Sequence, residues 1–414
     1  MTETPDEEDA PPDTPRRGAD EAWAAARKSQ FLDFGFRPFF LLCGLYAALS
    51  IVAWLLMYQG VLDVGGALPP SYWHGHEMLF GFAIAAVAGF LLTATPVWTD
   101  TEPASGAGLA FLATLWVLGR AAIWLGGALP PVVVAGLDLA LIPALGWTVG
   151  RAVVASRQLR NAVFPALLAV LFAANLLVHL EALGVTGDSA ALGLRLAIYV
   201  FTVMVAVLGS RMVPAFTRNA LRRDGIEGEV RSGRGVQVGV AVAVVAAIAA
   251  DLAAAPELAQ GVLAVCAAVL LAVFMSGWQT RLVLGQPILW IMHLAYAWLP
   301  AGFALKGLAD LTGILPQTAA LHGMATGAVG TMILAMTTRV ALGHTGRQLK
   351  VAPPITVAYV LVTLAALFRV AAPMAAPDAY MPSIMASGLC WAAAFAIFTV
   401  VYWPILTGPR ADEP

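Results

Sequence analysis

WHGHEMLFGFAIAAVAGFLLTAT, residues 73–95, is the stretch that decides the fold. After Glu77 it runs for eighteen residues without a charged side chain. A helix that crosses a bilayer needs about 20 consecutive, mostly apolar residues, so this stretch predicts a transmembrane helix. Its opening residues place His74, His76 and Glu77 at the entrance to that helix.

Similar stretches recur along nearly the whole chain. The 414 residues are 60% hydrophobic and 12% charged, with a mean hydropathy of +0.81. Soluble domains are about 45–50% apolar and about 25% charged, so a soluble enzyme is excluded. We expect an all-α polytopic membrane protein of about twelve spans, numbered in order: 37–57, 73–95, 106–125, 131–150, 163–181, 193–213, 235–255, 258–275, 287–305, 318–341, 353–371 and 384–404.

The orientation follows from the basic residues, which concentrate in cytoplasmic loops. With both termini inside, 19 of the 23 lysines and arginines lie on the cytoplasmic side. The other four are Arg120, Arg195, Lys306 and Arg369. Residues 1–30 are acidic and lack an apolar core, which predicts a disordered cytoplasmic tail. Residues 31–405 then form the transmembrane domain, and 406–414 form a cytoplasmic C-terminal tail.

Weak internal repeats appear when the chain is compared with itself. At an offset of about 250 residues, spans 1–3 resemble spans 9–11, with His74-Gly75 matching His322-Gly323. An offset of 128 aligns Met204 with Met332 and Arg211 with Arg339. These matches predict parallel repeats of four helices.

Several functional classes have no support in the sequence. A net charge of −2 and a pI near 6.3 give no basic surface for nucleic acid. Cys43, Cys266 and Cys390 lie in apolar runs without disulfide or metal-binding spacing. Phosphate-binding loops and nucleophile elbows are also missing from the sequence, which leaves hydrolytic and nucleotide-driven functions without a motif.

Ionisable groups inside a bilayer are costly and indicate function. All six histidines lie within or beside spans: His74, His76, His179, His293, His322 and His344. His322 and His344 are 22 residues apart, roughly 33 Å along a helix, so the histidines would form two sites, one towards each face. His74 and His76 bind one centre only if their helix begins irregularly, and otherwise each serves a different partner helix.

Imidazole is a ligand of haem iron, copper and zinc. A haem in the outer half would use His74 or His76 together with His322, and arginines would bind its propionates. The arginines at that level are Arg120, Arg195 and Arg369. Met78 and Met324 could offer thioethers to copper, and Glu77 could relay protons. Arg339 is a further cofactor-binding candidate at the inner face, although snorkelling to the headgroups is sufficient to explain its position.

Three motifs resemble the NnrS family: FRPFF at 36–40, WHGHEMLFG at 73–81, and His322-Gly323 leading to MTTRVALGHTGR at 336–347. The resemblance covers about residues 31–405. It implies a polytopic inner-membrane protein of bacteria that contains haem and copper and acts in the response to nitric oxide. It also implies His74, His76, His322 and His344 as ligand candidates, with His293 and His179 beside them.

Three functions stay open at this level. The first is reduction of nitric oxide at a histidine-ligated b-type haem, with electrons from a quinol or a cytochrome and protons through Glu77. The second is a protein that binds nitric oxide or protects against it without turnover. The third is a transporter of a metal or metal complex. Polar residues gather near the two faces rather than at the midplane, which favours fixed redox centres.

Overall fold

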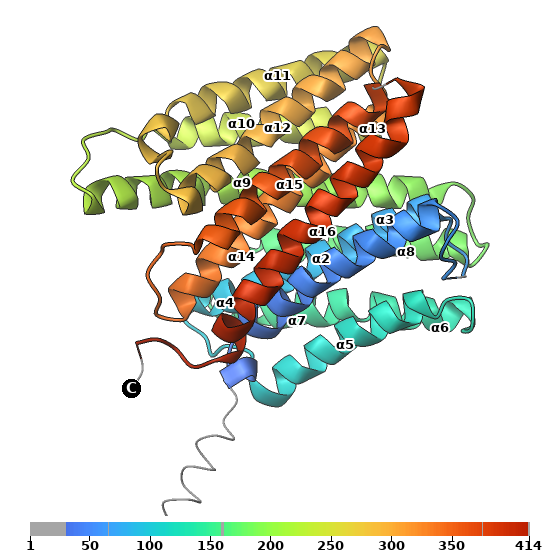
Figure 1. Cartoon of the computed structure of the whole chain (residues 1–414), viewed down its shortest axis with the longest axis horizontal. Coiled ribbons are helices and arrows are strands. Elements are labelled where there is room, and N and C mark those ends of the chain that lie inside the picture. Colours follow the sequence, from blue (N-terminus) through green and yellow to red (C-terminus); the bar gives the residue numbers. More distant parts are fainter. Residues whose placement is uncertain (1–29, 65, 159–160, 375, 413–414) are drawn as a thin grey trace, which may run out of the picture.

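The computed structural model describes residues 30–64, 66–158, 161–374 and 376–412 (Figure 1). The described residues are mostly helical and contain no strand. Twelve helical segments in them are long and apolar enough to cross a membrane, which confirms the predicted class and number of spans. The predicted tail at 1–30 lies outside the described residues except for Gln30.

The elements follow in chain order: η1 (Gln30–Leu32), α2 (Phe36–Tyr58), α3 (Pro70–His76), η2 (Glu77–Ala83), α4 (Ile84–Thr99), α5 (Gly106–Trp124), α6 (Pro131–Leu139), α7 (Leu141–Ala155), α8 (Val163–Ala182), α9 (Ser189–Arg223), α10 (Arg234–Leu252), α11 (Glu257–Ser276), η4 (Thr280–Val283), α12 (Pro287–Thr312), α13 (Gln317–His322), η5 (Gly323–Gly330), α14 (Thr331–His344), α15 (Pro353–Ala371), η6 (Ala372–Met374) and α16 (Pro377–Thr407). Span 2 comprises α3, η2 and α4, span 4 comprises α6 and α7, and span 10 comprises α13, η5 and α14. Span 6 is longer than the predicted 193–213 because α9 continues beyond its apolar part to Arg222 and Arg223.

Three spans depart from regular α-helix within their length, and span 11 ends in the short 3₁₀ turn η6. In span 4 the helix is interrupted between α6 and α7. Pro143 accounts for the break, since its ring clashes with the carbonyl four residues earlier, at Leu139. In spans 2 and 10 the segments η2 and η5 are π-helical, and each begins directly after a histidine, His76 or His322. Such π-turns occur frequently at functional sites.

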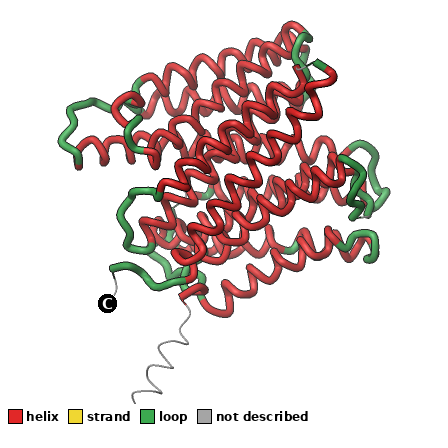
Figure 2. Tube along the Cα trace, in the orientation of Figure 1, coloured by secondary structure: helices red, strands yellow, loops and turns green. Residues whose placement is uncertain are grey.

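The helices pack side by side and their loops gather at two opposite ends of the bundle (Figure 2). Three groups of four spans follow one another: α2–α7, α8–α11 and α12–α16. The last span of each group packs on the first span of the next, through α7 with α8, α11 with α12, and α16 with α2. This closed ring is the packing that four-helix repeats would produce.

The centre of the ring is formed by spans 2, 6 and 10, where α9 contacts η2 and η5. Span 2 is the most enclosed, with 83% of its apolar window buried, against 22% for α10 at the periphery. Along α10 the exposed side chains include Val238, Val242 and Val245, which suits contact with lipid. Polar groups on spans 2 and 10 are therefore shielded from lipid by other helices.

Both ends of the bundle lie on one face. The Nη1 atom of Arg37, at the start of α2, donates to the carbonyl oxygens of Leu406 (3.1 Å) and Gly408 (2.6 Å), at the end of α16. An even number of spans requires this arrangement. That this face is cytoplasmic stays a prediction from the basic residues.

Candidate metal and cofactor sites

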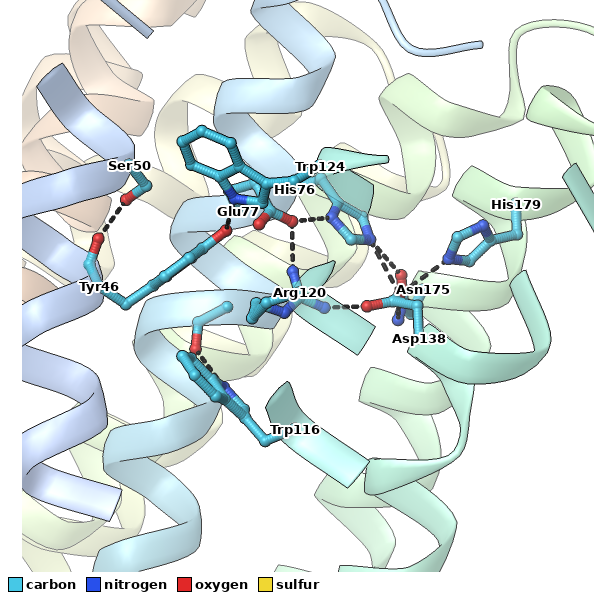
Figure 3. A network of polar contacts seen from close by, with 11 residues as sticks. Tyr46, Ser50, His76, Glu77, Trp116, Arg120, Trp124, Asp138, Asn175 and His179 are labelled. Atoms are coloured by element: carbon cyan, nitrogen blue, oxygen red, sulfur yellow. Dashed lines mark hydrogen bonds and ion pairs between the residues drawn. The ribbon is translucent and has the colours of Figure 1, made fainter. Parts of the chain in front are cut away.

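Six buried polar side chains from five helical segments meet between spans 2, 3, 4 and 5 (Figure 3). This histidine–aspartate cluster consists of His76 from α3, Glu77 from η2, Arg120 from α5, Asp138 from α6, and Asn175 and His179 from α8. The cluster joins the first group of four spans to the second. Its residues come from distant parts of the sequence. They are brought together where α8 packs on α6 and on α7.

Three ligand atoms converge at the centre of the cluster. The Nε2 atom of His76 lies 3.1 Å from Oδ2 of Asp138, and Nε2 of His179 lies 2.8 Å from the same oxygen. Single donor atoms of His76, Asp138 and His179 all lie within 4.8 Å of one another. The amide oxygen of Asn175 is a fourth atom that could bind a metal ion, and it lies 3.0 Å from Nε2 of His76. Two imidazoles and a carboxylate are a common set of ligands for a transition metal.

The neighbouring charged groups orient these ligands. Glu77 Oε1 lies 2.7 Å from Nδ1 of His76, so in the tautomer with its proton on Nδ1 the imidazole donates to this carboxylate and keeps the Nε2 lone pair for a metal ion. Histidines that bind metals usually donate their other ring N–H in this way. Arg120 pairs with Glu77 and with Oδ1 of Asp138, which leaves Oδ2 to face the histidines.

The charge of the cluster favours a bound cation. With neutral histidines and both carboxylates ionised, Glu77 and Asp138 contribute two negative charges and Arg120 one positive charge, a sum of −1. A lone pair on His76 that faces a carboxylate oxygen is repulsive unless a proton or a metal ion lies between them. Oε2 of Glu77 is also buried without a hydrogen-bond partner among the described residues. The donor set therefore fits a metal ion.

Local sequence explains how the cluster can assemble. Gly119 allows α5 to approach α6 closely, since a Cβ atom there would lie 3.2 Å from the Cα of Asp138. The π-helical turn leaves the carbonyl of Gly81 available, and Nε1 of Trp116 donates to it over 3.0 Å (Figure 3). That bond fixes α5 against η2, beside Arg120.

A separate cavity of about 460 Å³ lies on the other side of span 2. We call it the cofactor cavity. Its polar lining includes His74 from α3 and His322 from α13, together with Arg195 and Arg369. Most of its remaining wall is apolar or aromatic, formed by residues that include Trp54, Tyr72, Leu79, Phe82, Leu321 and Trp391. The volume lies within the roughly 300–1,000 Å³ that is usual for cofactor pockets.

The two histidines of the cavity are held by their surroundings. The ring of His74 stacks on Trp54, with the centroids 4.2 Å apart. Nδ1 of His322 donates to the carbonyl oxygen of Thr318 over 2.7 Å, which leaves its Nε2 as the atom with a lone pair. Two imidazoles, two guanidinium groups and an apolar wall fit a haem with its propionates. The residues of this cavity thus fit the implied cofactor.

The structure separates the histidines that sequence reasoning had left as alternatives. His74 lines the cofactor cavity with His322, whereas His76 joins the cluster with His179. They therefore serve different partner helices, the second of the two options. Arg195 lines the cavity, but Arg120 belongs to the cluster. Glu77 also belongs to the cluster and is not among the residues that line the cavity.

Met78 also lines the cofactor cavity, whereas the candidates His293, His344 and Arg339 lie apart from both sites. The ring nitrogens of His293 are 2.8 Å and 2.9 Å from the hydroxyls of Thr217 and Thr280. His344 packs on Phe36 with ring centroids 5.6 Å apart, and the guanidinium of Arg339 lies 3.8 Å from the ring centroid of Phe216. Packing and hydrogen bonding account for these three positions, and their roles as ligands stay predictions.

Sequence reasoning missed two residues of the cluster, Asp138 and Asn175. Asp138 is the single ionisable residue between 131 and 150, so the rule that led to the histidines would also have found it. Asn175 carries no charge and gives no comparable signal.

A second buried charged network was also missed. Nζ of Lys306 lies 2.6 Å from Asp251 and 3.0 Å from Asp310, and the hydroxyl of Tyr199 donates to Asp251 over 2.7 Å. Arg195 lies 3.7 Å from the same carboxylate. Tyr199, Asp251 and Arg195 all line the cofactor cavity, so this network borders one wall of it.

The fold and the sites together define a polytopic helical membrane protein with a buried group of side chains that could bind a metal ion. The model of the NnrS family, described as NnrS protein, matches residues 30–410, nearly the whole chain. The chain belongs to the NnrS family. A comparison with functionally curated proteins finds no match.

Proposed function

We propose that the protein is a haem- and copper-containing protein of the bacterial inner membrane that binds nitric oxide in the cofactor cavity and reduces it there. The observation that carries the proposal is the meeting of His74 and His322 with Arg195 and Arg369 around one cavity. A b-type haem held there would supply an iron that binds a diatomic ligand and accepts electrons from a quinol or a cytochrome. Family membership and the fit of the residues support this assignment.

The side chains of the cavity have separable roles in the proposal. His74 and His322 present imidazoles from two different spans, and either would hold the haem iron. Arg195 and Arg369 bind the carboxylates of the cofactor and set its orientation. The apolar wall excludes water and strengthens every polar contact inside.

In the same proposal the histidine–aspartate cluster binds copper. His76, His179 and Asp138 are the ligands, and Glu77 orients His76 through its Nδ1–H. Arg120 holds both carboxylates in place. Glu77 is then a positioning residue whose contacts lie in the cluster, and its sequence-based role as a proton relay is a competing proposal.

The first experiment is an optical spectrum of the purified protein in detergent, oxidised, reduced with dithionite and then exposed to nitric oxide. A reducible haem whose bands shift with nitric oxide is the expected result. His74→Ala and His322→Ala should each change or abolish that spectrum. His293→Ala is the comparison variant: both ring nitrogens of this buried histidine face threonine hydroxyls, so its spectrum should not change, and a change would make it a haem ligand. A protein purified without haem would contradict the assignment.

Copper is tested separately by metal analysis. His179→Ala removes one of the ligands and should lower the bound copper while the haem spectrum is retained. Equal loss of haem and copper in this variant would contradict the separation of the two sites. Steady-state loss of nitric oxide with an added electron donor then separates reduction from binding alone.

Glu77→Gln distinguishes the two roles of Glu77. A residue that hydrogen-bonds a metal ligand is worth about 10–100-fold in metal affinity, so the positioning role predicts weaker copper binding. The relay role predicts lower turnover of nitric oxide with copper affinity unchanged. Full turnover and unchanged copper affinity would remove both roles.

A further inference from the structure

A second, smaller pocket of about 80 Å³ lies at the centre of the bundle, where spans 1, 2, 6, 9 and 10 meet. Five of the thirteen methionines of the chain line it: Met204, Met212, Met292, Met332 and Met336. We call it the methionine pocket. Methionine has a flexible, polarisable side chain that fills irregular gaps and can adapt to a guest.

The methionine pocket is apolar. Its lining residues carry no charge, and the single hydroxyl among them belongs to Thr337. That hydroxyl donates to the carbonyl oxygen of Leu334 over 3.1 Å, so it is engaged within its own helix. A buried water needs about two to four polar partners, and the lining of this pocket does not offer them. Its volume also exceeds the roughly 10–15 Å³ that one water requires, so the pocket suits a small apolar guest.

The methionine pocket adjoins the cofactor cavity. Phe201 from α9 and Val329 from η5 line both of them. Val329 lies seven residues after His322, which is about 10 Å along a helix. A guest in the pocket is therefore separated from the cavity by the side chains of these shared residues.

We propose that the methionine pocket binds a small uncharged molecule of diatomic size, which passes between this pocket and the cofactor cavity past Phe201 and Val329. That the pocket can bind an apolar guest follows from its lining residues and its volume. The identity of the guest as nitric oxide rests on the proposed function. Uncharged gases enter apolar cavities without loss of hydrogen bonds, whereas ions and polar substrates lose their hydration there.

Xenon is the probe, because dry apolar cavities bind it and its binding does not require haem. We expect a bound xenon at the methionine pocket in crystals pressurised with the gas, with a matching exchange-shifted signal in ¹²⁹Xe NMR. Val329→Phe fills the shared wall and should abolish that signal, whereas Met332→Ala widens the pocket and should strengthen it. Val360→Phe is the control on the lipid-facing side of α15 and should leave it unchanged.

Two results would overturn the proposal. One is a native protein without xenon at this position, and the other is xenon binding that neither Val329→Phe nor Met332→Ala changes. Loss of bound copper in Met332→Ala would assign the thioethers to a metal and would also overturn it. Xenon binding in a protein that lacks haem keeps the pocket and removes only nitric oxide as its guest, so the two failures are distinguishable.

Discussion

At the scale of single residues, the histidine–aspartate cluster depends on Asp138. Its two carboxylate oxygens have different partners: one pairs with Arg120, and the other faces His76 and His179. Asp138→Asn keeps the shape but removes the charge that a metal ion needs. We expect copper binding to fall and thermal stability to drop, because Arg120 loses one of its two buried anionic partners. Asp378→Asn, at an exposed carboxylate at the start of α16, is the control and should change neither.

Lys306 is the corresponding test for the second charged network. It is 2% exposed and pairs with Asp251 and Asp310. Breaking a buried ion pair costs about 3–5 kcal/mol because it leaves unpaired charge, so Lys306→Met should lower the midpoint of thermal unfolding clearly. Lys350→Met, at an exposed loop residue, should not. An unchanged midpoint in Lys306→Met would show that the carboxylates of Asp251 and Asp310 do not depend on this lysine.

At this scale the sequence predicted which types of residue form the sites better than it predicted which residues contact one another. The cost of charge in a bilayer pointed to the histidines, Arg195 and Arg369, and His74 and His322 indeed line one cavity. The partners of His76 could not be predicted, since Asp138 and Asn175 come from spans 4 and 5 and meet it only through packing. Nor did spacing decide which of His74 and His76 faces His322. That choice depends on how span 2 is rotated against its neighbours.

At the scale of elements, the π-helical segments η2 and η5 fix the two sites in place. Both follow a histidine, and both pack through glycines against aromatic rings. A Cβ atom at Gly327 in η5 would overlap the indole of Trp298, and one at Gly330 would overlap the ring of Trp391. Trp391 lines the cofactor cavity, so η5 cannot move away from it without changing the cavity.

Gly327→Ala tests this role of η5. The added methyl group must displace either α12 or η5, and we expect weaker haem retention and a lower unfolding midpoint. Gly239→Ala in α10 is the control, because a Cβ atom there meets nothing within 4 Å. An alanine in an open helical position stabilises by roughly 0.5–1 kcal/mol relative to glycine. If Gly327→Ala also stabilised the protein and kept its haem, the close packing of η5 would not matter for the site.

The elements themselves were largely predictable, because long apolar runs leave little choice in a bilayer. All twelve spans were located, although α9 begins at Ser189 and continues to Arg223, beyond both predicted ends of span 6. The interruption after Leu139 and the π-helical turns were not predicted. Apolar periodicity does not report such local changes of helical pitch, although Pro143 marks the first of them.

At the scale of the whole molecule, the three groups of four spans close into a ring whose centre is built by spans 2, 6 and 10. Because His74 and His76 begin the same span, the cofactor cavity and the histidine–aspartate cluster lie at the same level. The bond from Arg37 to Gly408 places the two ends of the bundle on the opposite face. Orientation therefore decides on which side of the membrane both sites lie.

The distribution of basic residues predicts that this side is the outer one, since 19 of 23 lysines and arginines lie on the side of the termini. A fluorescent protein fused to the C-terminus should fluoresce in the cytoplasm, and alkaline phosphatase fused there should be inactive. Phosphatase fused after Val185, in the loop between α8 and α9 on the other side, should be active. The reverse pattern would place both sites on the cytoplasmic side, and their electron donor would then have to be sought there.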